Sequence, residues 1–138
     1  MNDVEFVQQF EARTLPAECF HHRDHVKLVW LYLQRYPMLE TLVRFSEGLR
    51  RFAAANGKHN LYHETITWAY VFLIHERLKR AGGKQSWEEF VAANPDLFNW
   101  QNNILKTYYR EETLRSELAR RVFVFPNQSA QIQVVGAK

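Results

Sequence analysis

The chain has 138 residues, of which 46% are hydrophobic and 14% aromatic, and its formal net charge is +3. This composition excludes a disordered chain and fits one globular domain with its own hydrophobic core. The 18 Lys and Arg residues are dispersed along the chain, so the basic charge does not favour nucleic-acid binding.

The cysteine content and the first residues predict the compartment. Cys19 is the single cysteine, so the chain cannot form an internal disulfide, which is typical of a reducing environment. The opening stretch "MNDVEFVQQFEART" lacks the features of a signal peptide, and no apolar run reaches the roughly 20 residues that span a bilayer. We therefore expect a cytoplasmic protein without a membrane segment.

Apolar residues at helical spacing predict three helices in the first part of the chain. They run from Asp3 to the Leu15–Pro16 pair, from the His21–Asp24 region to Tyr36, and from Pro37 to about Ala55. Asn56–Gly57 is a typical stop signal for the third helix.

The fourth predicted helix is the longest and runs from about Leu61 to Ala81, closed by Gly82–Gly83. Asn60 is the expected N-cap. The stretch "ITWAYVFLI" in this helix is apolar nearly all round, which predicts that it is the most enclosed helix of the fold.

The remaining chain predicts shorter elements. Ser86 and Glu89 form a capping-box pattern for a short helix that ends before Asn94–Pro95, and "NWQNNILKTYY" and "EETLRSELARRVF" predict two more helices. We thus expect an all-α, single-domain helical bundle of six to seven helices over residues 1–126. Residues 127–138 are expected to be an extended or disordered tail.

Two segments gather the residues that could carry chemistry: "FHHRDH", which contains His21, His22 and His25, and "YHETIT", which contains His63. In a helix, His25 neighbours both His21, four residues earlier, and His22, three residues earlier. His25 also continues the apolar stripe of its helix, so its ring is expected to point inward.

The order of the helices joins these segments. Three consecutive helices in up-down-up order make the second and the fourth parallel, which brings their starts to the same end of the bundle. Both histidine segments lie at such a start, so two distant motifs predict one site.

Histidine nitrogens in this number suit a metal ion. His25, His63 and either His21 or His22 could supply three ligands to Zn²⁺ or Fe²⁺ and leave a position open. Glu64 could be a fourth ligand or a general base acting on metal-bound water.

Other side chains near the two segments complete the predicted site. Asp24 could orient a ligating imidazole, and Tyr62, Trp30 and Trp68 could line a pocket. The zincin peptidase pattern H-E-x-x-H is excluded, because Thr67 stands where His63–Glu64 would require the second histidine.

Two functions follow from these residues. The first is a small metal-dependent enzyme acting on a small molecule by hydrolysis, elimination or oxidation. The alternative is a non-enzymatic helical protein that binds a small ligand or a partner through a histidine-lined polar pocket. Apolar faces on so many short helices could also support a homodimer, although no heptad seam specifies one.

The pairing of "FHHRDHVKLVWLYL" with "YHETIT", the intervening "GLRRFAAANGK" and the later "ANPDL" resemble a family of short bacterial helical proteins. The resemblance extends from about Phe20 to Pro126. It implies a bacterial, cytoplasmic protein, and it carries over no activity, cofactor or functional residue.

Overall fold

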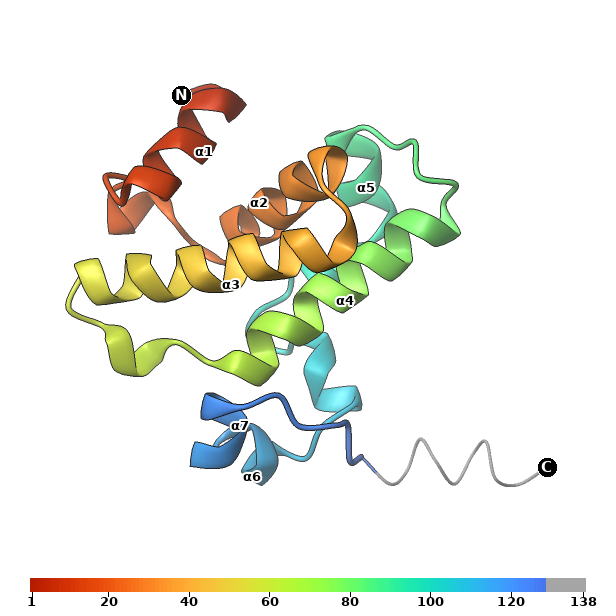
Figure 1. The fold of residues 1–138 in the computed structure, drawn as a ribbon. Helices are drawn as coiled ribbons and strands as arrows, with labels where there is room; N and C mark the ends of the chain where they lie inside the picture. Colours follow the sequence, from red (N-terminus) through yellow and green to blue (C-terminus); the bar gives the residue numbers. More distant parts are fainter. Residues whose placement is uncertain (129–138) are drawn as a thin grey trace.

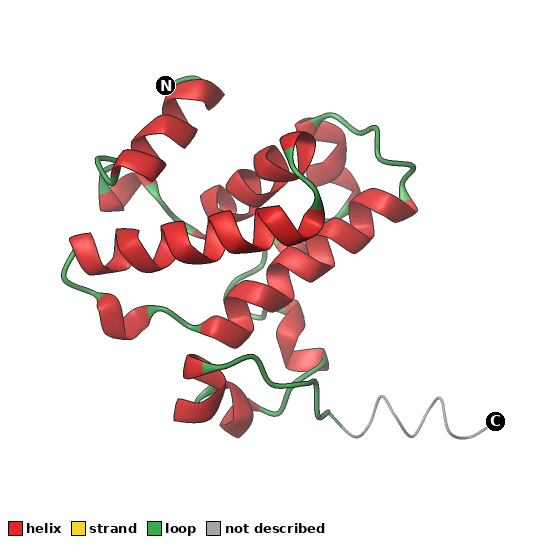
Figure 2. Ribbon diagram, viewed as in Figure 1, coloured by secondary structure: helices red, strands yellow, loops and turns green. Residues whose placement is uncertain are grey.

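The computed structural model of the chain describes residues 1–128, and this part contains helices and no strand (Figures 1 and 2). The expected all-α bundle is therefore confirmed, while most of the predicted tail at 127–138 lies outside the described residues. The α-helices are α1 (Asp3–Ala12), α2 (His22–Arg35), α3 (Met38–Ala55), α4 (Glu64–Arg80), α5 (Trp87–Ala93), α6 (Glu111–Leu114) and α7 (Glu117–Arg121). Short 3-10 helices are η1 (Ala17–Cys19), η2 (His59–Leu61), η3 (Pro95–Leu97) and η4 (Ile104–Thr107).

Helices α2, α3 and α4 pack on one another and form the centre of the fold. In Figure 1, α2 and α4 run in the same general direction, and α3 runs the opposite way and packs on both. The starts of α2 and α4 and the end of α3 therefore lie at one end of the bundle, as the up-down-up order predicts.

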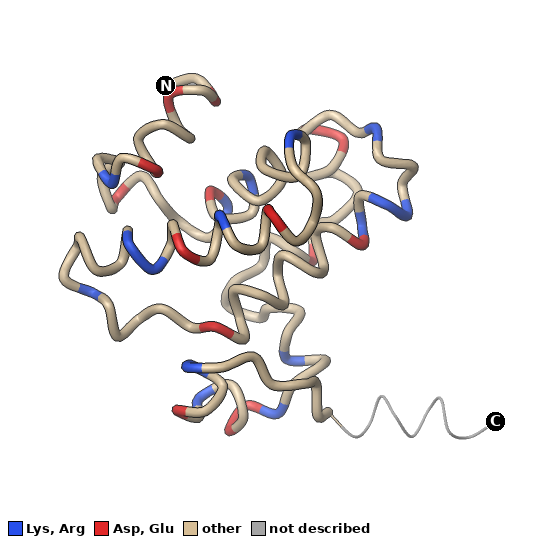
Figure 3. Tube along the Cα trace, viewed as in Figure 1, with Lys and Arg blue, Asp and Glu red and all other residues tan. Residues whose placement is uncertain are grey.

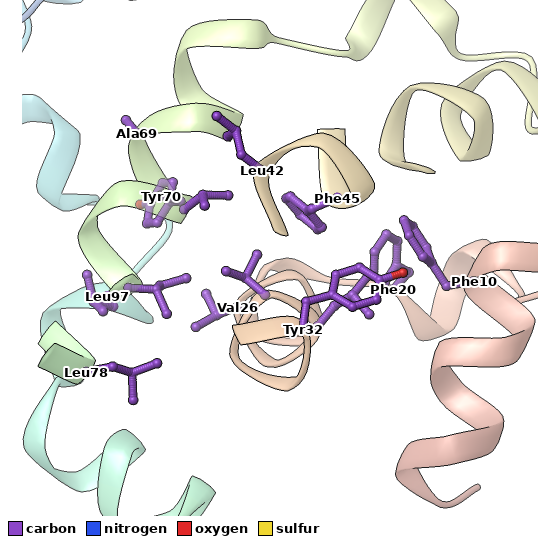
Figure 4. Packing of buried hydrophobic residues seen from close by; sticks show 14 of the residues in the cluster. Phe10, Phe20, Val26, Tyr32, Leu42, Phe45, Ala69, Tyr70, Leu78 and Leu97 are labelled. Atoms are coloured by element: carbon purple, nitrogen blue, oxygen red, sulfur yellow. The ribbon is translucent and has the colours of Figure 1, made fainter. Parts of the chain in front are cut away.

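The core is rich in aromatic residues (Figure 4). Phe10 of α1 and the adjacent Phe20 lie beside Phe45 of α3, while Tyr70 and Leu97 lie at the opposite side of the cluster. Gly48 permits the close approach of α1 to α3, because a Cβ atom at this position would lie 2.6 Å from Cε2 of Phe10. Burial of these rings is the main source of stability.

The C-terminal part of the described chain packs against the start of α4. The Thr65 hydroxyl donates to the Val122 carbonyl at 2.8 Å and accepts from the Val124 N–H at 3.1 Å. The Tyr109 hydroxyl donates to the Val124 carbonyl at 2.7 Å. These bonds attach residues 109–124 to the first turn of α4.

The predicted helices at 99–109 and 111–123 were too long. The first contains only the 3-10 helix η4, and the second breaks into α6 and α7. Asparagine and serine side chains explain both differences, because they bond to nearby backbone N–H groups in competition with a continuous helix. Asn99 accepts from the N–H of Asn102, Asn103 from that of Leu105, and Ser116 from that of Ala119.

Charged residues of both signs are interspersed along the described chain (Figure 3). Several basic side chains pair with a carboxylate one helical turn away, as in Glu40–Arg44, Glu47–Arg51 and Glu76–Arg80. Within the described residues, no helix has both the length and the apolar run needed to cross a bilayer.

Candidate functional site

A cavity of about 580 Å³ opens at the end of the bundle where α2 and α4 begin and α3 ends. Its inner wall is apolar and aromatic and is contributed by α2, α3 and α4: Val26, Val29, Phe45, Leu49, Phe52, Ile66, Tyr70 and Ile74. Its mouth is formed by the exposed lining residues His21, Asn56, Lys58, Leu61 and Trp100. An apolar interior with a polar mouth is typical of a small-molecule site.

Both histidine segments reach this cavity. His21, His22, His25 and His63 all belong to its lining, although 38 residues separate the last two in the sequence. The packing of α2 on α4 produces this arrangement, since each segment stands at the start of its helix.

His63 is held by the main chain through both ring nitrogens. Its Nδ1 accepts from the Ile66 N–H at 3.1 Å, and its Nε2 donates to the Leu114 carbonyl at 2.7 Å. These partners fix the neutral tautomer with the proton on Nε2. Burial is the main reason why the pKa of His63 lies below its ordinary value, and the Arg120 charge acts in the same direction.

The prediction that Asn60 caps α4 was therefore wrong. The helix begins at Glu64, and the side chain of His63 is its N-cap. Asn60 instead lies in η2, where its carbonyl accepts from the Arg120 guanidinium at 3.0 Å. A histidine can replace the usual Asn or Ser cap because its neutral Nδ1 is a hydrogen-bond acceptor.

His22 connects α2 to the segment after α5. Its Nε2 lies 2.8 Å from the Leu97 carbonyl, which can only accept, so the neutral ring donates from Nε2 and keeps a lone pair on Nδ1. The ring lies 4.9 Å from the centroids of both Tyr70 and Trp100. Burial lowers the pKa of His22, while the bond to Leu97 partly opposes this effect.

His25 is surrounded by aromatic rings. Its centroid lies 4.1 Å from that of Phe20 and 6.4 Å from that of Phe45. Burial, followed by the charges that His22 and His21 would carry, lowers the pKa of His25 to about 4. The ring is therefore neutral at pH 7.

These positions bear directly on the predicted metal ligands. Within residues 1–128, no three His, Cys, Asp or Glu side chains form a group that could hold a metal ion. The predicted set of His25, His63 and His21 or His22 is not assembled in this arrangement. Ligation through Nε2 would require His63 and His22 to leave the carbonyls of Leu114 and Leu97.

Glu64 does not line the cavity and belongs to a separate cluster. It accepts a 2.5 Å bond from the Tyr62 hydroxyl and a 3.2 Å bond from Arg50, whose guanidinium also lies 4.7 Å from the centre of the Tyr62 ring. Tyr62 does line the cavity, and burial followed by the bond to Glu64 raises its pKa to about 12. The carboxylate therefore positions a wall residue of the cavity.

The other predicted pocket residues lie elsewhere. Trp30 packs on Trp87 at 5.6 Å, and Trp68 stacks on Phe123 at the same distance. Asp24 accepts from the backbone N–H of His21 at 3.0 Å and so stabilises the start of α2. None of the three contributes to the cavity lining.

Sequence reasoning missed Lys58 and Trp100 at the mouth and Thr67 in the wall. Thr67 follows His63 by one helical turn, so the helical spacing could have identified it. Lys58 and Trp100 lie outside the α-helices, and the periodicity of the sequence gives no signal for such positions.

Comparison of the chain with protein-family models, with curated proteins and with solved structures finds no match. The resemblance to short bacterial proteins therefore stays a prediction, and the cavity is the feature of the structure that bears on function.

Proposed function

We propose that this protein binds a small molecule with a mostly apolar body and one polar end, in the cavity between α2, α3 and α4. One observation carries the proposal: a cavity of about 580 Å³ has an apolar aromatic interior, four histidines in its lining and a largely polar mouth. Its volume lies within the roughly 300–1,000 Å³ that ligand sites in proteins occupy. The proposal keeps the small-ligand binding of the non-enzymatic alternative that the sequence offered, but replaces its polar pocket with a mostly apolar one.

The fixed wall residues support the same proposal. His22 and His63 are each tied to a main-chain carbonyl that lies more than 50 positions away in the sequence, so their rings are held in place before any ligand arrives. A preformed wall reduces the entropy that binding costs. A cytoplasmic location remains part of the proposal and rests on the free thiol of Cys19.

A cavity-filling substitution tests the proposal with the neutral dye N-phenyl-1-naphthylamine, whose fluorescence increases in apolar surroundings. Ala53 of α3 lines the cavity, whereas the next residue, Ala54, is exposed and does not. We expect saturable dye binding to the unmodified protein, its loss in Ala53→Trp and its retention in Ala54→Trp. Circular dichroism of both variants provides the folding control. Failure of the dye to bind, or equal binding to both variants, would contradict the proposal.

The metal-dependent enzyme is the second candidate, and the meeting of four histidines at one cavity favours it. The test is elemental analysis of protein prepared without chelator and then incubated with zinc or ferrous iron. Stoichiometric metal that disappears in both His25→Ala and His63→Asn would support this candidate. Metal-free protein under both conditions would exclude it.

A further inference from the structure

We infer that the polar end of the ligand is an anionic group, so that the cavity selects organic anions such as carboxylates or sulfonates with an apolar body. This inference rests on the proposed small-molecule binding and specifies the chemical class of ligand. It follows from the charges, helix ends and hydrogen-bonding groups that surround the mouth.

The lining carries no negative charge. Among the described residues that form it, none is Asp or Glu, and Lys58 at the mouth carries a full positive charge. Asp24 and Glu64, which each stand next to a lining histidine in the sequence, already accept hydrogen bonds, Asp24 from the His21 N–H and Glu64 from Tyr62 and Arg50. A cationic ligand would therefore meet Lys58 without a compensating carboxylate.

The helix ends favour negative charge at the same place. Helices α2 and α4, with 14 and 17 residues, both begin at the cavity, and the start of a helix carries partial positive charge, of which Asp24, Glu64 and the His63 cap compensate a part. The end of α3 has the opposite sign, but local donors already occupy three of its last four carbonyls. The Phe52 and Ala53 carbonyls accept from the Asn56 N–H, and the Ala54 carbonyl accepts from the Gly57 N–H.

The histidines connect anion binding to proton uptake. Neutral His22 directs its proton at Leu97 and keeps a lone pair on Nδ1, which would repel an anion. An anion beside the ring stabilises the protonated form, in which Nδ1 also donates. Binding of an anion should therefore strengthen as the pH falls towards 6.

The titratable groups that share the cavity lining with His22 are His21, His25, Lys58, His63 and Tyr70, and Asp96 stands next to its partner Leu97 in the sequence. Asp96 is the one carboxylate in this set, and Arg77 holds it with two bonds of 3.0 and 2.8 Å. Its charge is thus compensated, and it does not by itself favour protonation of His22.

Two dyes of matched shape test the inference. 8-Anilino-1-naphthalenesulfonate has the ring system of N-phenyl-1-naphthylamine plus one sulfonate, and neither dye changes charge between pH 6 and pH 7.5. At pH 7.5 we expect the sulfonate dye to bind about tenfold more tightly than the neutral dye, because one charge-assisted hydrogen bond would provide a difference of this size. Equal affinities, or tighter binding of the neutral dye, would overturn the inference while leaving the proposed function intact. Absence of binding by both dyes would overturn both.

Variants locate the anionic group. Lys58→Gln should weaken binding of the sulfonate dye severalfold and leave the neutral dye unchanged, whereas Lys84→Gln, in the exposed loop after α4, should change neither. Ala53→Trp should abolish binding of both dyes, and sulfonate binding that survives it would contradict the inference. An unchanged ratio of the two affinities in Lys58→Gln would also contradict it.

The pH dependence has its own variant. In the unmodified protein, the affinity for the sulfonate dye should rise about threefold between pH 7.5 and pH 6, with the near-ultraviolet circular dichroism unchanged. His22→Gln retains a donor for the Leu97 carbonyl but cannot take up the proton, so this rise should largely disappear. A rise of equal size in the variant, or a matching rise for the neutral dye, would contradict the role of His22.

Discussion

The histidines at the two helix starts that meet at the cavity differ in how many of their ring nitrogens bond to the main chain. At the start of α4, both ring nitrogens of His63 bond to the main chain, one to Ile66 and the other to Leu114. At the start of α2, His25 packs among Phe20 and Phe45, and His22 uses one nitrogen and leaves the other as an acceptor. The α4 histidine is thus a structural cap, while the α2 histidines retain capacity for a ligand.

This difference shows that a histidine beside a cavity is not in itself a functional group. What decides its role is the number of ring nitrogens that the protein's own backbone already occupies. We therefore propose that the α2 side recognises the ligand and that the α4 side provides rigidity, and each role can be tested separately.

The largest expected effect is a loss of stability in acid, caused by His25 on the α2 side. The folded state holds His25 at a pKa of about 4, below the ordinary value of 6.5, so the unfolded chain binds more protons between these values. The contribution of His25 to stability is therefore complete above pH 6.5 and is lost as the pH falls towards 4. From this residue we expect the free energy of unfolding to decrease by about 3 kcal/mol over that range.

Urea unfolding between pH 7 and pH 4 measures this loss. In His25→Leu, the free energy of unfolding should decrease less between pH 7 and pH 4 than in the unmodified protein. The difference should be close to the whole contribution of His25, because the buried titrating ring is absent. If the stability of this variant depended on pH as that of the unmodified protein does, the pKa of His25 would not be lowered by folding.

Removal of the His63 cap of α4 should lower the free energy of unfolding by slightly less than acid does through His25. His63→Ala loses the bond to the Ile66 N–H and leaves the Leu114 carbonyl without its partner, so we expect a loss of about 2 kcal/mol in urea unfolding at pH 7.5. His63→Asn can restore the cap but cannot reach Leu114, and should lose about half as much. His59→Ala, at an exposed position of η2, is the control and should change stability by less than about 0.5 kcal/mol. If both His63 variants matched this control, the ring would not be a structural cap.

The smallest effect is expected at Glu64. Glu64→Gln keeps an acceptor for the Tyr62 hydroxyl and loses only the ion pair with the half-exposed Arg50, so about 1 kcal/mol or less should be lost. The dissociation constants of both dyes should change by less than about twofold, since Glu64 does not line the cavity. Loss of dye binding in this variant would indicate that the α4 side takes part directly in recognition. It would contradict the proposed division of roles between the α2 and α4 sides.

The sequence predicted the central helices well because their signals are local. The apolar spacing in α2 and α3, the Asn56–Gly57 stop and the Ser86–Glu89 capping box each act within a few residues, and the Ser86–Glu89 bonds form as expected. The chain after residue 98 was harder to predict, because asparagine side chains that bond to the nearby backbone interrupt its apolar pattern.

The candidate site could be predicted only in part for a related reason. The order of the helices sufficed to bring His25 and His63 to one cavity, since α2, α3 and α4 are joined by short connections and alternate in direction. The bond that engages His63 comes from Leu114, which is 51 positions further along the chain. No local pattern reports such a contact, so the sequence could not distinguish a capping histidine from a ligating one.

The attachment of residues 109–124 to the first turn of α4 has a consequence for the order of folding. During synthesis, α1, α2 and α3 can pair as soon as they emerge, but the Thr65 hydroxyl and the Nε2 of His63 acquire their partners only when Val122, Val124 and Leu114 have been made. Closing a loop of this length costs entropy that only the later contacts repay. One wall of the cavity is thus completed late, and a ribosome-bound chain that ends before Leu114 should leave the start of α4 open to proteolysis while the α2–α3 pair is already protected.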